Sequence, residues 1–570
     1  MIPRPVKIFF ALFALFVIVF SFGSDLAVKQ RGGFFSDESS YFAIMQSLAF
    51  DGDLKYDRGD IRRIERDFVV GPIGFFLKKG RDGQIYYAKS YVYPLFAAPF
   101  YRLFGVHGIL LCNGLMLWLV MLMGFLLLSR LHPPRWSLGH VLLYVLGSVA
   151  FCYIWWITAD LFNFFVVFTA LFFFFYPFRQ PRWHLLFALF FACAVFSKPN
   201  NVIAAGFLYL ILLWRRQWQR FAAAALLFLI VAGGLVAFNY FQTGEVNYQG
   251  GERRTFYFHY PYERPTDTFE SGHKMSSDDY WQRLHLSPHI AALNLFYYFF
   301  GRYTGMFIYF FPAVFLLILF FFGKKSAEDW FLFAAVVASI AFYLVITPEN
   351  YFGGAGSLGN RYFLSVYPLF FFLGWRARSL RFSLVPVIAA IVFLSPVVMD
   401  SFSLSASPRL PGLGLPIRWF PAEKTQYATL PSNINPRAFD RSVGGKYTLY
   451  YLTDAYHALE GESFWTVGDQ ELEMFLLAPA PVREFTMVLK NNPRPNRVHV
   501  QIENQRRRIV VSPNDTVRVH IRNVPCLRIG ERALYLVSIR SEREFTPFFD
   551  AGDSNDRRRL GVQVRLELAY

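Results

Sequence analysis

Runs of apolar residues long enough to cross a lipid bilayer constrain this chain more than any other feature. A helix rises about 1.5 Å per residue, so about 30 Å of hydrocarbon takes roughly 20 mostly apolar residues. These runs predict a mainly α-helical membrane protein with about eleven transmembrane helices. They lie at residues 6–22, 106–129, 137–154, 159–178, 183–197, 201–214, 219–240, 304–323, 329–347, 362–375 and 382–399.

Composition supports the same class. Only 17% of the residues are charged and 55% are hydrophobic, whereas soluble chains have about 25% charged residues. A cytosolic enzyme and a disordered chain are therefore excluded. Of the four cysteines, only Cys526 lies outside the apolar runs, so disulfide bonds do not hold the fold together. The first run lacks a small-residue cleavage site, which favours an uncleaved anchor over a signal peptide.

The positive charges indicate the orientation. If the N-terminus is cytoplasmic, the inside turns carry fourteen lysines and arginines, and the short outside connections carry only Lys198 and Arg361. This distribution follows the positive-inside rule and explains most of the net charge of +17 without nucleic acid. The odd number of spans then places the C-terminal part outside the cytoplasm. We expect a protein of the bacterial inner membrane with a periplasmic C-terminal domain.

The predicted domains follow from these spans. Residues 1–400 form the transmembrane domain, with outer loops at 23–105, 241–303 and 348–361. Residues 401–570 contain no span. Hydrophobic and polar residues alternate strictly there at 498–502, 517–521 and 562–568. Such alternation predicts half-buried strands, and we expect a β-sandwich-like extracytoplasmic domain.

Two acids follow the first span closely. Asp37 and Glu38 precede Tyr41, Ile44 and Met45, which repeat at helical spacing. The spacing predicts an amphipathic helix lying on the outer membrane surface. The acids could cap the positive end of this helix or take part in catalysis, and the sequence alone leaves both readings open.

Further ionisable residues stand at the outer mouths of the spans. Lys89 lies among tyrosines and could bind an anionic head group or extend along the apolar surface to water. Asp160 begins the fourth span, where it is either a helix cap or a functional group, and Lys198 follows the fifth. An ionisable group is costly at such positions, which makes each a functional candidate.

The last outer connection combines glycines with an arginine. Its glycines would let the backbone approach a ligand closely. Arg361 stands on the side of the membrane that the positive-inside rule disfavours. A guanidinium offers several fixed donors and stays charged, so it suits a phosphate. A functional role is therefore favoured for Arg361.

Metal and nucleotide signatures are missing from the pattern. The eleven histidines are scattered, and neither paired His or Cys spacings nor a phosphate-binding glycine loop occurs. We therefore expect no metal site, no cofactor and no nucleotide donor.

The order of these motifs resembles the GT-C class of integral-membrane glycosyltransferases, and within it the branch of the protein O-mannosyltransferases and the lipid A aminoarabinose transferase. The resemblance covers about residues 1–400. Asp37-Glu38 with Tyr41 is similar to the family's acidic motif after the first span. The stretch from Asp82 to Lys89 is similar to a later part of the same loop, although Ser90-Tyr91 stand where the family has prolines. Asp160, Lys198-Pro199 and Gly359-Asn360-Arg361-Tyr362 also fall where such enzymes have comparable elements.

This resemblance implies an inverting transfer of one sugar from a polyprenyl-phosphate donor to an acceptor hydroxyl on the extracytoplasmic side. Asp37 is the expected catalytic base and Glu38 the alternative base or orienting group. The other expected site residues either stabilise the leaving phosphate or bind substrate. The phosphate set is Lys89, Lys198, Arg361 and Arg302, and the substrate set is Asp160, Tyr41, Asn360 and Tyr362.

The expected partners are membrane lipids, the lipid-linked sugar and a glycan, lipid or protein acceptor, and a monomer is one possible state. The alternative function is a transporter or flippase for a lipid-linked saccharide. That reading predicts ionisable residues at mid-span and repeated halves, whereas here the charges gather at the outer mouths. A non-catalytic subunit of a larger assembly is a third reading.

Overall fold

The computed structural model describes residues 3–26, 36–67, 73–257, 259–274, 287–376, 384–434, 441–551 and 554–570. Two compact units emerge from the contacts within the chain. The first comprises Met1–Leu284, Thr304–Thr347 and Leu358–Ser407, and the second comprises His285–Tyr303, Pro348–Ser357 and Pro408–Tyr570. The predicted boundary at residue 400 stays a prediction.

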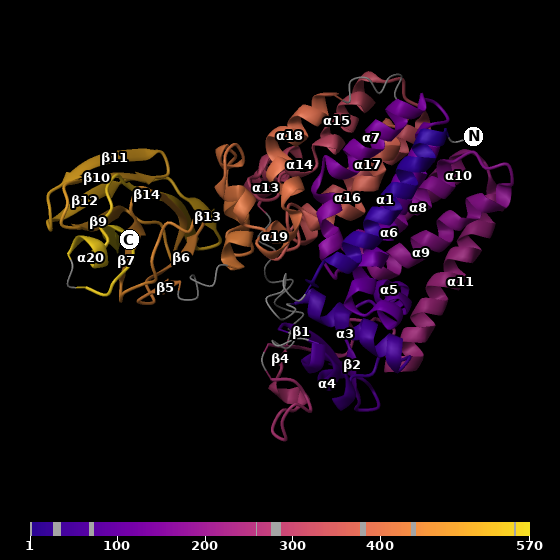
Figure 1. Ribbon diagram of the computed structural model, residues 1–570, viewed down its shortest axis with the longest axis horizontal. Coiled ribbons are helices and arrows are strands. Elements are labelled where there is room, and N and C mark those ends of the chain that lie inside the picture. The colour runs from indigo at the N-terminus through magenta and orange to yellow at the C-terminus, as the bar shows by residue number, and fades with distance from the viewer. Residues whose placement is uncertain are drawn as a thin grey trace. The chain divides into compact units, whose positions relative to one another are not determined.

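The first unit is mainly helical (Figure 1). Its α-helices are α1 (Arg4–Gly23), α3 (Asp37–Phe50), α4 (Arg58–Asp67), α5 (Val92–Phe104), α6 (Val106–Leu128), α7 (Pro134–Leu146), α8 (Ala159–Phe175), α9 (Leu186–Ser197), α10 (Val202–Trp214), α11 (Trp218–Thr243), α14 (Met306–Tyr309), α15 (Phe311–Phe322), α16 (Ala327–Ile346), α17 (Tyr367–Gly374), α18 (Leu384–Met399) and α19 (Ser401–Ala406). Short 3₁₀ helices at Val149–Trp155, Pro199–Asn201 and Arg361–Ser365 connect several of them.

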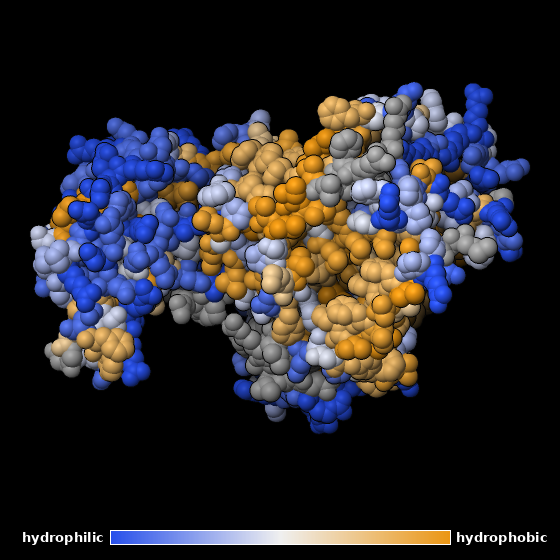
Figure 2. Space-filling model, turned by 45° about the horizontal axis from the view of Figure 1, so that its top comes forward, coloured by the Kyte–Doolittle hydropathy of each residue, from blue (hydrophilic) through white to orange (hydrophobic). Residues whose placement is uncertain are grey.

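Each of the eleven predicted runs coincides with helix in the structure, which confirms the helical membrane architecture. Among the described residues, four helices are long and apolar enough to cross a membrane, namely α1, α6, α11 and α16. A fifth span results if α7 and the 3₁₀ helix after it, bent by 61°, count as one. Five of the remaining runs contain apolar helices of 10–17 residues, and the run at 362–375 contains only the eight-residue α17. Apolar side chains gather on the surface over these helices (Figure 2).

A small antiparallel sheet joins the two long outer loops. Its strands are β1 (Phe75–Lys79) and β2 (Ile85–Tyr87) from the first loop, and β3 (Glu252–Phe256) and β4 (His273–Lys274) from the second. Their order is β2-β1-β3-β4. Phe75 pairs with Phe256 and Lys79 with Glu252, so residues about 175 positions apart in the chain become neighbours. This pairing fixes both loops in one rigid layer.

The helix predicted after the first span is present but is not a surface helix. α3 covers the predicted residues, and all side chains from Glu38 to Ser47 are buried. It packs against α4, α5 and β1 of the same unit. The expectation of an amphipathic helix on the membrane surface is therefore wrong, because polar residues such as Ser40 and Gln46 find hydrogen-bond partners inside the protein.

The second unit contains the predicted β-domain together with α13 (Pro288–Phe300). One sheet has the order β11-β10-β14-β8-β6-β5, with β13 on β14, and the other has the order β12-β9-β15-β7. The strands are β5 (Ser442–Val443), β6 (Tyr447–Tyr451), β7 (Ser463–Val467), β8 (Glu471–Ala478), β9 (Glu484–Asn491), β10 (Asn496–Ile502), β11 (Gln505–Val511), β12 (Thr516–Arg522), β13 (Leu527–Ile529), β14 (Arg532–Ser541) and β15 (Leu560–Ala569), and a short helix α20 (Pro547–Asp550) precedes β15.

The alternating segments of the sequence are strands, as predicted. They form most of β10, β12 and β15. Inward side chains of both sheets, such as Val498, Ile521 and Val564, meet in one apolar core. The outward positions are polar, and hydrophilic side chains dominate the face of this domain seen in Figure 2. The prediction of a C-terminal β-rich domain is confirmed.

Candidate active site

A cavity of about 1240 Å³ lies in the first unit, and its walls come from the two long loops predicted to be outer loops and from the ends of several helices. Its lining combines aromatic and apolar side chains with a group of charged ones. Among the described residues, the charged ones in the wall are Asp37, Lys89, Asp160, Lys198, Glu252, Arg253, Lys274 and Arg361. A cavity with more cations than acids favours an anionic ligand.

Five of these side chains form a row in which the sign of the charge alternates. Lys89 Nζ lies 2.6 Å from one oxygen of Asp37, and Arg361 Nη1 lies 3.1 Å from the other. The same Nη1 atom lies 4.0 Å from Asp160, whose second oxygen pairs with Lys198. The row thus brings together five predicted residues from four distant stretches of the chain.

The row is largely shielded from solvent. Asp160 is 4% exposed, and the other four side chains are between 14% and 20% exposed. Burial alone would raise the pKa of Asp37, but the charges of Lys89 and Arg361 outweigh burial and hold this pKa well below its usual range. Burial is likewise the largest influence on Lys89, and it lowers the pKa of this ammonium although Asp37 opposes the shift. Asp37 is therefore an ionised carboxylate at neutral pH.

Asp37 is placed by the N-terminus of α3. The preceding Ser36 makes no side-chain capping bond, and the Asp37 carboxylate turns to the two cations. The backbone of Phe76 in β1 donates to Ser40 Oγ at 3.0 Å, which ties the first turn of α3 to the small sheet. The side-chain contacts of Asp37 therefore do not favour a role as a helix cap.

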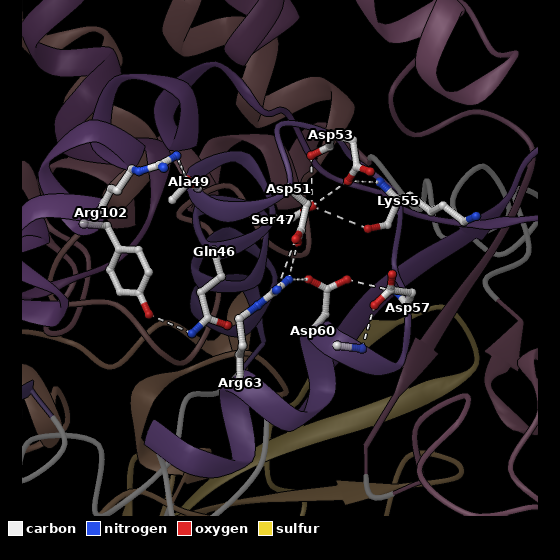
Figure 3. Close-up of polar contacts among 12 residues, drawn as sticks. Gln46, Ser47, Ala49, Asp51, Asp53, Lys55, Asp57, Asp60, Arg63 and Arg102 are labelled. Carbon is white, nitrogen blue, oxygen red and sulfur yellow. Dashed lines mark hydrogen bonds and ion pairs between the residues drawn. The ribbon is translucent and has the colours of Figure 1, made fainter.

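The other end of α3 is held by a polar network, which Figure 3 shows. Arg102 donates to the carbonyl of Ala49 at 2.7 Å, and Gln46 donates to the hydroxyl of Tyr101 at 2.8 Å. Arg63 of α4 pairs with both Asp51 and Asp60. Because both ends are tied, α3 holds Asp37 in a fixed position.

Arg253 is a site residue that the sequence analysis missed. It lies on β3, lines the cavity and contributes to the low pKa of Asp37. Its guanidinium carbon is 4.6 Å from the centre of the Phe76 ring, and Lys89 Nζ is 4.5 Å from the same ring. Two cations beside one aromatic ring concentrate positive charge at this part of the wall, which suits an anionic group. Lys274 of β4 adds a further positive charge to the wall.

The Asp160–Lys198 pair closes the other side of the row. Thr158 Oγ1 donates to Asp160 at 2.8 Å, so the carboxylate has three polar neighbours. Lys198 Nζ also lies 5.1 Å from the centre of the Tyr362 ring. These contacts come from side chains rather than from helix amides, so they differ from those of a simple cap.

Arg361 follows a turn that needs glycine. Gly359 has a φ of +68°, and a Cβ atom there would lie 3.0 Å from Tyr309. Asn360 Oδ1 accepts from the backbone of Phe363 at 3.1 Å and so caps the short helix that carries Arg361. Gly359 therefore lies close to another part of the protein, namely Tyr309. The expectation was that the glycines let the backbone approach a ligand.

The remaining predicted residues divide into two groups. Tyr41 and Tyr362 line the cavity. Glu38 accepts from the backbone of Ile157 at 2.9 Å, and neither Glu38 nor Asn360 is among the described residues that line the cavity. Arg302 belongs to the second unit, where it pairs with Glu473 at 2.6 Å and donates to the carbonyl of Phe420 at 3.0 Å. The roles predicted for these three residues stay predictions.

Comparisons with known proteins give little beyond the fold. No family model matches the chain, and no curated protein matches it. One similar solved structure is ArnT from Cupriavidus metallidurans bound to undecaprenyl phosphate, with 14% identity over 72% of this chain and 75% of that chain and a TM-score of 0.41.

A second similar structure is TmCBM61 in complex with β-1,4-galactotriose. It has 12% identity and covers 24% of this chain and 92% of that chain, with a TM-score of 0.13.

Proposed function

We propose that the protein is an integral-membrane glycosyltransferase that moves one sugar from a polyprenyl-phosphate carrier to an acceptor hydroxyl. The observation that carries this proposal is the Asp37 carboxylate held between Lys89 and Arg361 in the wall of a large cavity. A carboxylate beside a cluster of cations supplies the two functions that the reaction needs, a base and an electrostatic site for the leaving phosphate.

The phosphate would bind where Lys89, Arg253 and Arg361 come together. When the bond between the anomeric carbon and the phosphate oxygen breaks, the polyprenyl phosphate leaves with about one additional negative charge. Fixed cations in a site with little water stabilise that charge more strongly than water does. Lys198 stands at the far end of the same row, beyond Asp160.

The base would be Asp37. A carboxylate held by two cations is a weak base, because its pKa is low. A bound phosphate takes up part of the charge of Lys89 and Arg361, and the pKa of Asp37 then rises toward the working pH. Asp37 accepts the proton of the acceptor hydroxyl as its oxygen attacks the anomeric carbon. Donor binding thus prepares the base, and a single displacement inverts the anomeric centre.

Aromatic and polar side chains next to the row would hold the sugar. Tyr41, Tyr248 and Tyr362 line the cavity together with Asn247 and Gln249. Tyrosine rings pack against the apolar faces of a sugar, and amides and hydroxyls bind its hydroxyl groups. Asp160 lies in the same wall, 4.0 Å from Arg361, and would orient a sugar hydroxyl there. The second outer loop therefore contributes to the choice of substrate.

The orientation belongs to the same proposal. The positive-inside distribution places the N-terminus in the cytoplasm and the site on the outer side. No nucleotide sugar is available there, so a lipid carrier would deliver the activated sugar. We place the protein in the bacterial inner membrane, with the β-domain in the periplasm.

Direct binding of polyprenyl phosphate tests the proposal. Purified protein in detergent is titrated with undecaprenyl phosphate, and the bound complex is measured by native mass spectrometry. We expect Lys89→Met and Arg253→Met to weaken binding about 10- to 100-fold, because each loses a charge-assisted contact. Lys79→Met is the matched control, since Lys79 is an exposed lysine of β1 that is paired with Glu270. Equal binding by all four proteins would contradict the proposal.

A further inference from the structure

A second group of ionisable side chains lies in the second outer loop, outside the cavity wall. His259, Glu263 and Asp267 each offer one ligand atom, and these atoms lie within 4.8 Å of one another. The Nδ1 atom of His259 is 3.9 Å from Oδ1 of Asp267. Two ligands of a tetrahedral zinc ion, each at about 2.0–2.1 Å from the metal, are separated by roughly 3.3 Å. The three side chains therefore need to move by less than about 1.5 Å to share one ion.

Asp267, the least exposed of the three side chains, has a carboxylate oxygen that accepts no hydrogen bond from the described residues. The side chain of Asp267 is 10% exposed, and its Oδ2 atom is buried and accepts no hydrogen bond. A buried carboxylate oxygen without a hydrogen bond is costly, and such an atom calls for an explanation. A metal ion bound by the Asp267 carboxylate would compensate for this missing hydrogen bond.

The backbone of the loop holds the three residues together. Tyr262 N donates to the carbonyl of Asp267 at 3.2 Å, and Asp267 N donates to the carbonyl of Arg264 at 3.0 Å. The hydroxyl of the buried Tyr56 donates to the carbonyl of Pro261 at 3.0 Å, which anchors the loop on the first outer loop. The ring of Tyr262 stacks on that of Tyr56 at 6.0 Å. The site is thus built on a fixed turn.

We propose that His259, Glu263 and Asp267 bind one divalent transition-metal ion, with zinc as the best match. Two carboxylates give the group a charge that a dication neutralises. The imidazole favours zinc over calcium and magnesium, which prefer sites made of oxygen ligands. Three protein ligands leave a fourth position for water.

The metal would act as a clamp for the loop that follows β3. This strand carries Arg253 into the cavity, and the loop begins directly after its last residue, Phe256. A bound ion would join both ends of the segment 259–267 and so limit the motion of the loop. This metal site does not depend on the proposed glycosyltransferase activity.

Zinc binding to the full-length protein in detergent tests the proposal. The protein is stripped with EDTA, its purification tag is removed, and zinc affinity and stoichiometry are measured by competition with a chromophoric chelator. We expect one tightly bound zinc ion per chain, and at least a 10-fold loss of affinity in His259→Ala, Glu263→Gln and Asp267→Asn. His289→Ala is the control, because His289 is an exposed histidine of the second unit.

Thermal unfolding provides an independent readout. Zinc should raise the melting temperature of the wild type and of His289→Ala but not that of the three ligand variants. His259 and Glu263 are exposed, so their variants should match the wild type in EDTA even if Asp267→Asn folds poorly. Absence of stoichiometric zinc binding, unchanged affinity in all three variants, or binding of calcium in preference to zinc would overturn the proposal.

Discussion

At the scale of single residues, the position of Arg361 restricts most strongly which side chain can occupy it. One of its terminal nitrogens lies 3.1 Å from Asp37 and 4.0 Å from Asp160, so it connects two carboxylates from different helices. Both contacts use this single nitrogen, and Nε is buried without a hydrogen-bond partner among the described residues, so the planar fork has donors that neither carboxylate uses. A lysine ammonium carries the same charge at a single point.

We therefore expect Arg361→Lys to reduce kcat/KM for sugar transfer about 10- to 100-fold while the protein stays folded. The measurement is the rate of donor consumption, together with the melting temperature as a check of folding. Arg254→Lys is the control, because Arg254 is the neighbour of Arg253 on β3 but pairs with Glu252 and Glu270. Equal activity of Arg361→Lys and the wild type would show that the fork geometry is not needed.

All five residues of the row could be predicted as site candidates from the sequence, whereas Arg253, which lines the same cavity, could not. Asp37, Asp160, Lys198 and Arg361 are ionisable groups next to apolar runs, which is a strong signal in a membrane protein. Arg253 lies in a polar loop among other charged residues, where an arginine carries no such signal. Only the pairing of β1 with β3 brings it beside Phe76 and Lys89.

The group formed by His259, Glu263 and Asp267 could not be recognised from the sequence for a related reason. His259, Glu263 and Asp267 are spaced by four residues, which in a helix would place them on one face. The segment is a turn, and its own hydrogen bonds bring the three side chains together. Spacing alone therefore gives no reason to connect them.

At the scale of elements, α3 and α4 form the support of the site. Asp60 of α4 has a side chain that is only 1% exposed, although Arg63 pairs with it. Burial raises the pKa of Asp60 to about 6 despite its hydrogen bond from Asp57 and its pairing with Arg63. Ionisation of this carboxyl above that pH therefore works against the folded state.

The sign of the pH dependence follows from this shift. Between the unfolded pKa of about 3.9 and the folded pKa, the native state binds more protons than the unfolded state, so stability falls as pH rises. For Asp60 the expected loss between pH 5 and pH 7.5 is about 1–1.5 kcal/mol. Asp60→Asn cannot ionise and should lack this component. The measurement is the melting temperature of both proteins in detergent at the two pH values, and an identical pH response would contradict the assignment.

The elements themselves show where the sequence is informative. Apolar runs gave the positions of the helices and strict alternation gave β10, β12 and β15, because both patterns depend on burial of one face or of all faces. The position of α3 in the sequence was predicted correctly, but the helix is buried inside the protein and does not lie on its surface as expected. Its polar residues look like a solvated face, whereas they bind groups from distant segments, such as Tyr101 and the backbone of Phe76.

At the scale of the whole molecule, the chain combines apolar helices with a polar β-domain. The orientation proposed above makes a prediction about accessibility. Ser512 lies in the exposed turn between β11 and β12, and Lys324 lies in the exposed turn between α15 and α16. In intact cells with a permeabilised outer membrane, a membrane-impermeant maleimide should label Ser512→Cys and should not label Lys324→Cys.

The native cysteines favour this experiment. Cys112, Cys152 and Cys193 are buried, and Cys526 is partly exposed, so Cys526→Ser provides a suitable background. After lysis, both introduced cysteines should react. Labelling of Lys324→Cys alone in intact cells would invert the orientation and place the cavity on the cytoplasmic side.

The central claim is that Asp37 is the base of a sugar transfer from a polyprenyl-phosphate donor. The most direct measurement is consumption of a panel of radiolabelled polyprenyl-phosphate sugars by the purified wild type, Asp37→Asn and Glu38→Gln. We predict turnover of at least one donor by the wild type, a loss of about 10²- to 10⁴-fold in Asp37→Asn, and nearly full activity in Glu38→Gln, since a glutamine oxygen can still accept from Ile157. Equal turnover by Asp37→Asn and the wild type would contradict the claim, and binding of lipid-linked saccharide without turnover by any of the three proteins would favour a transporter.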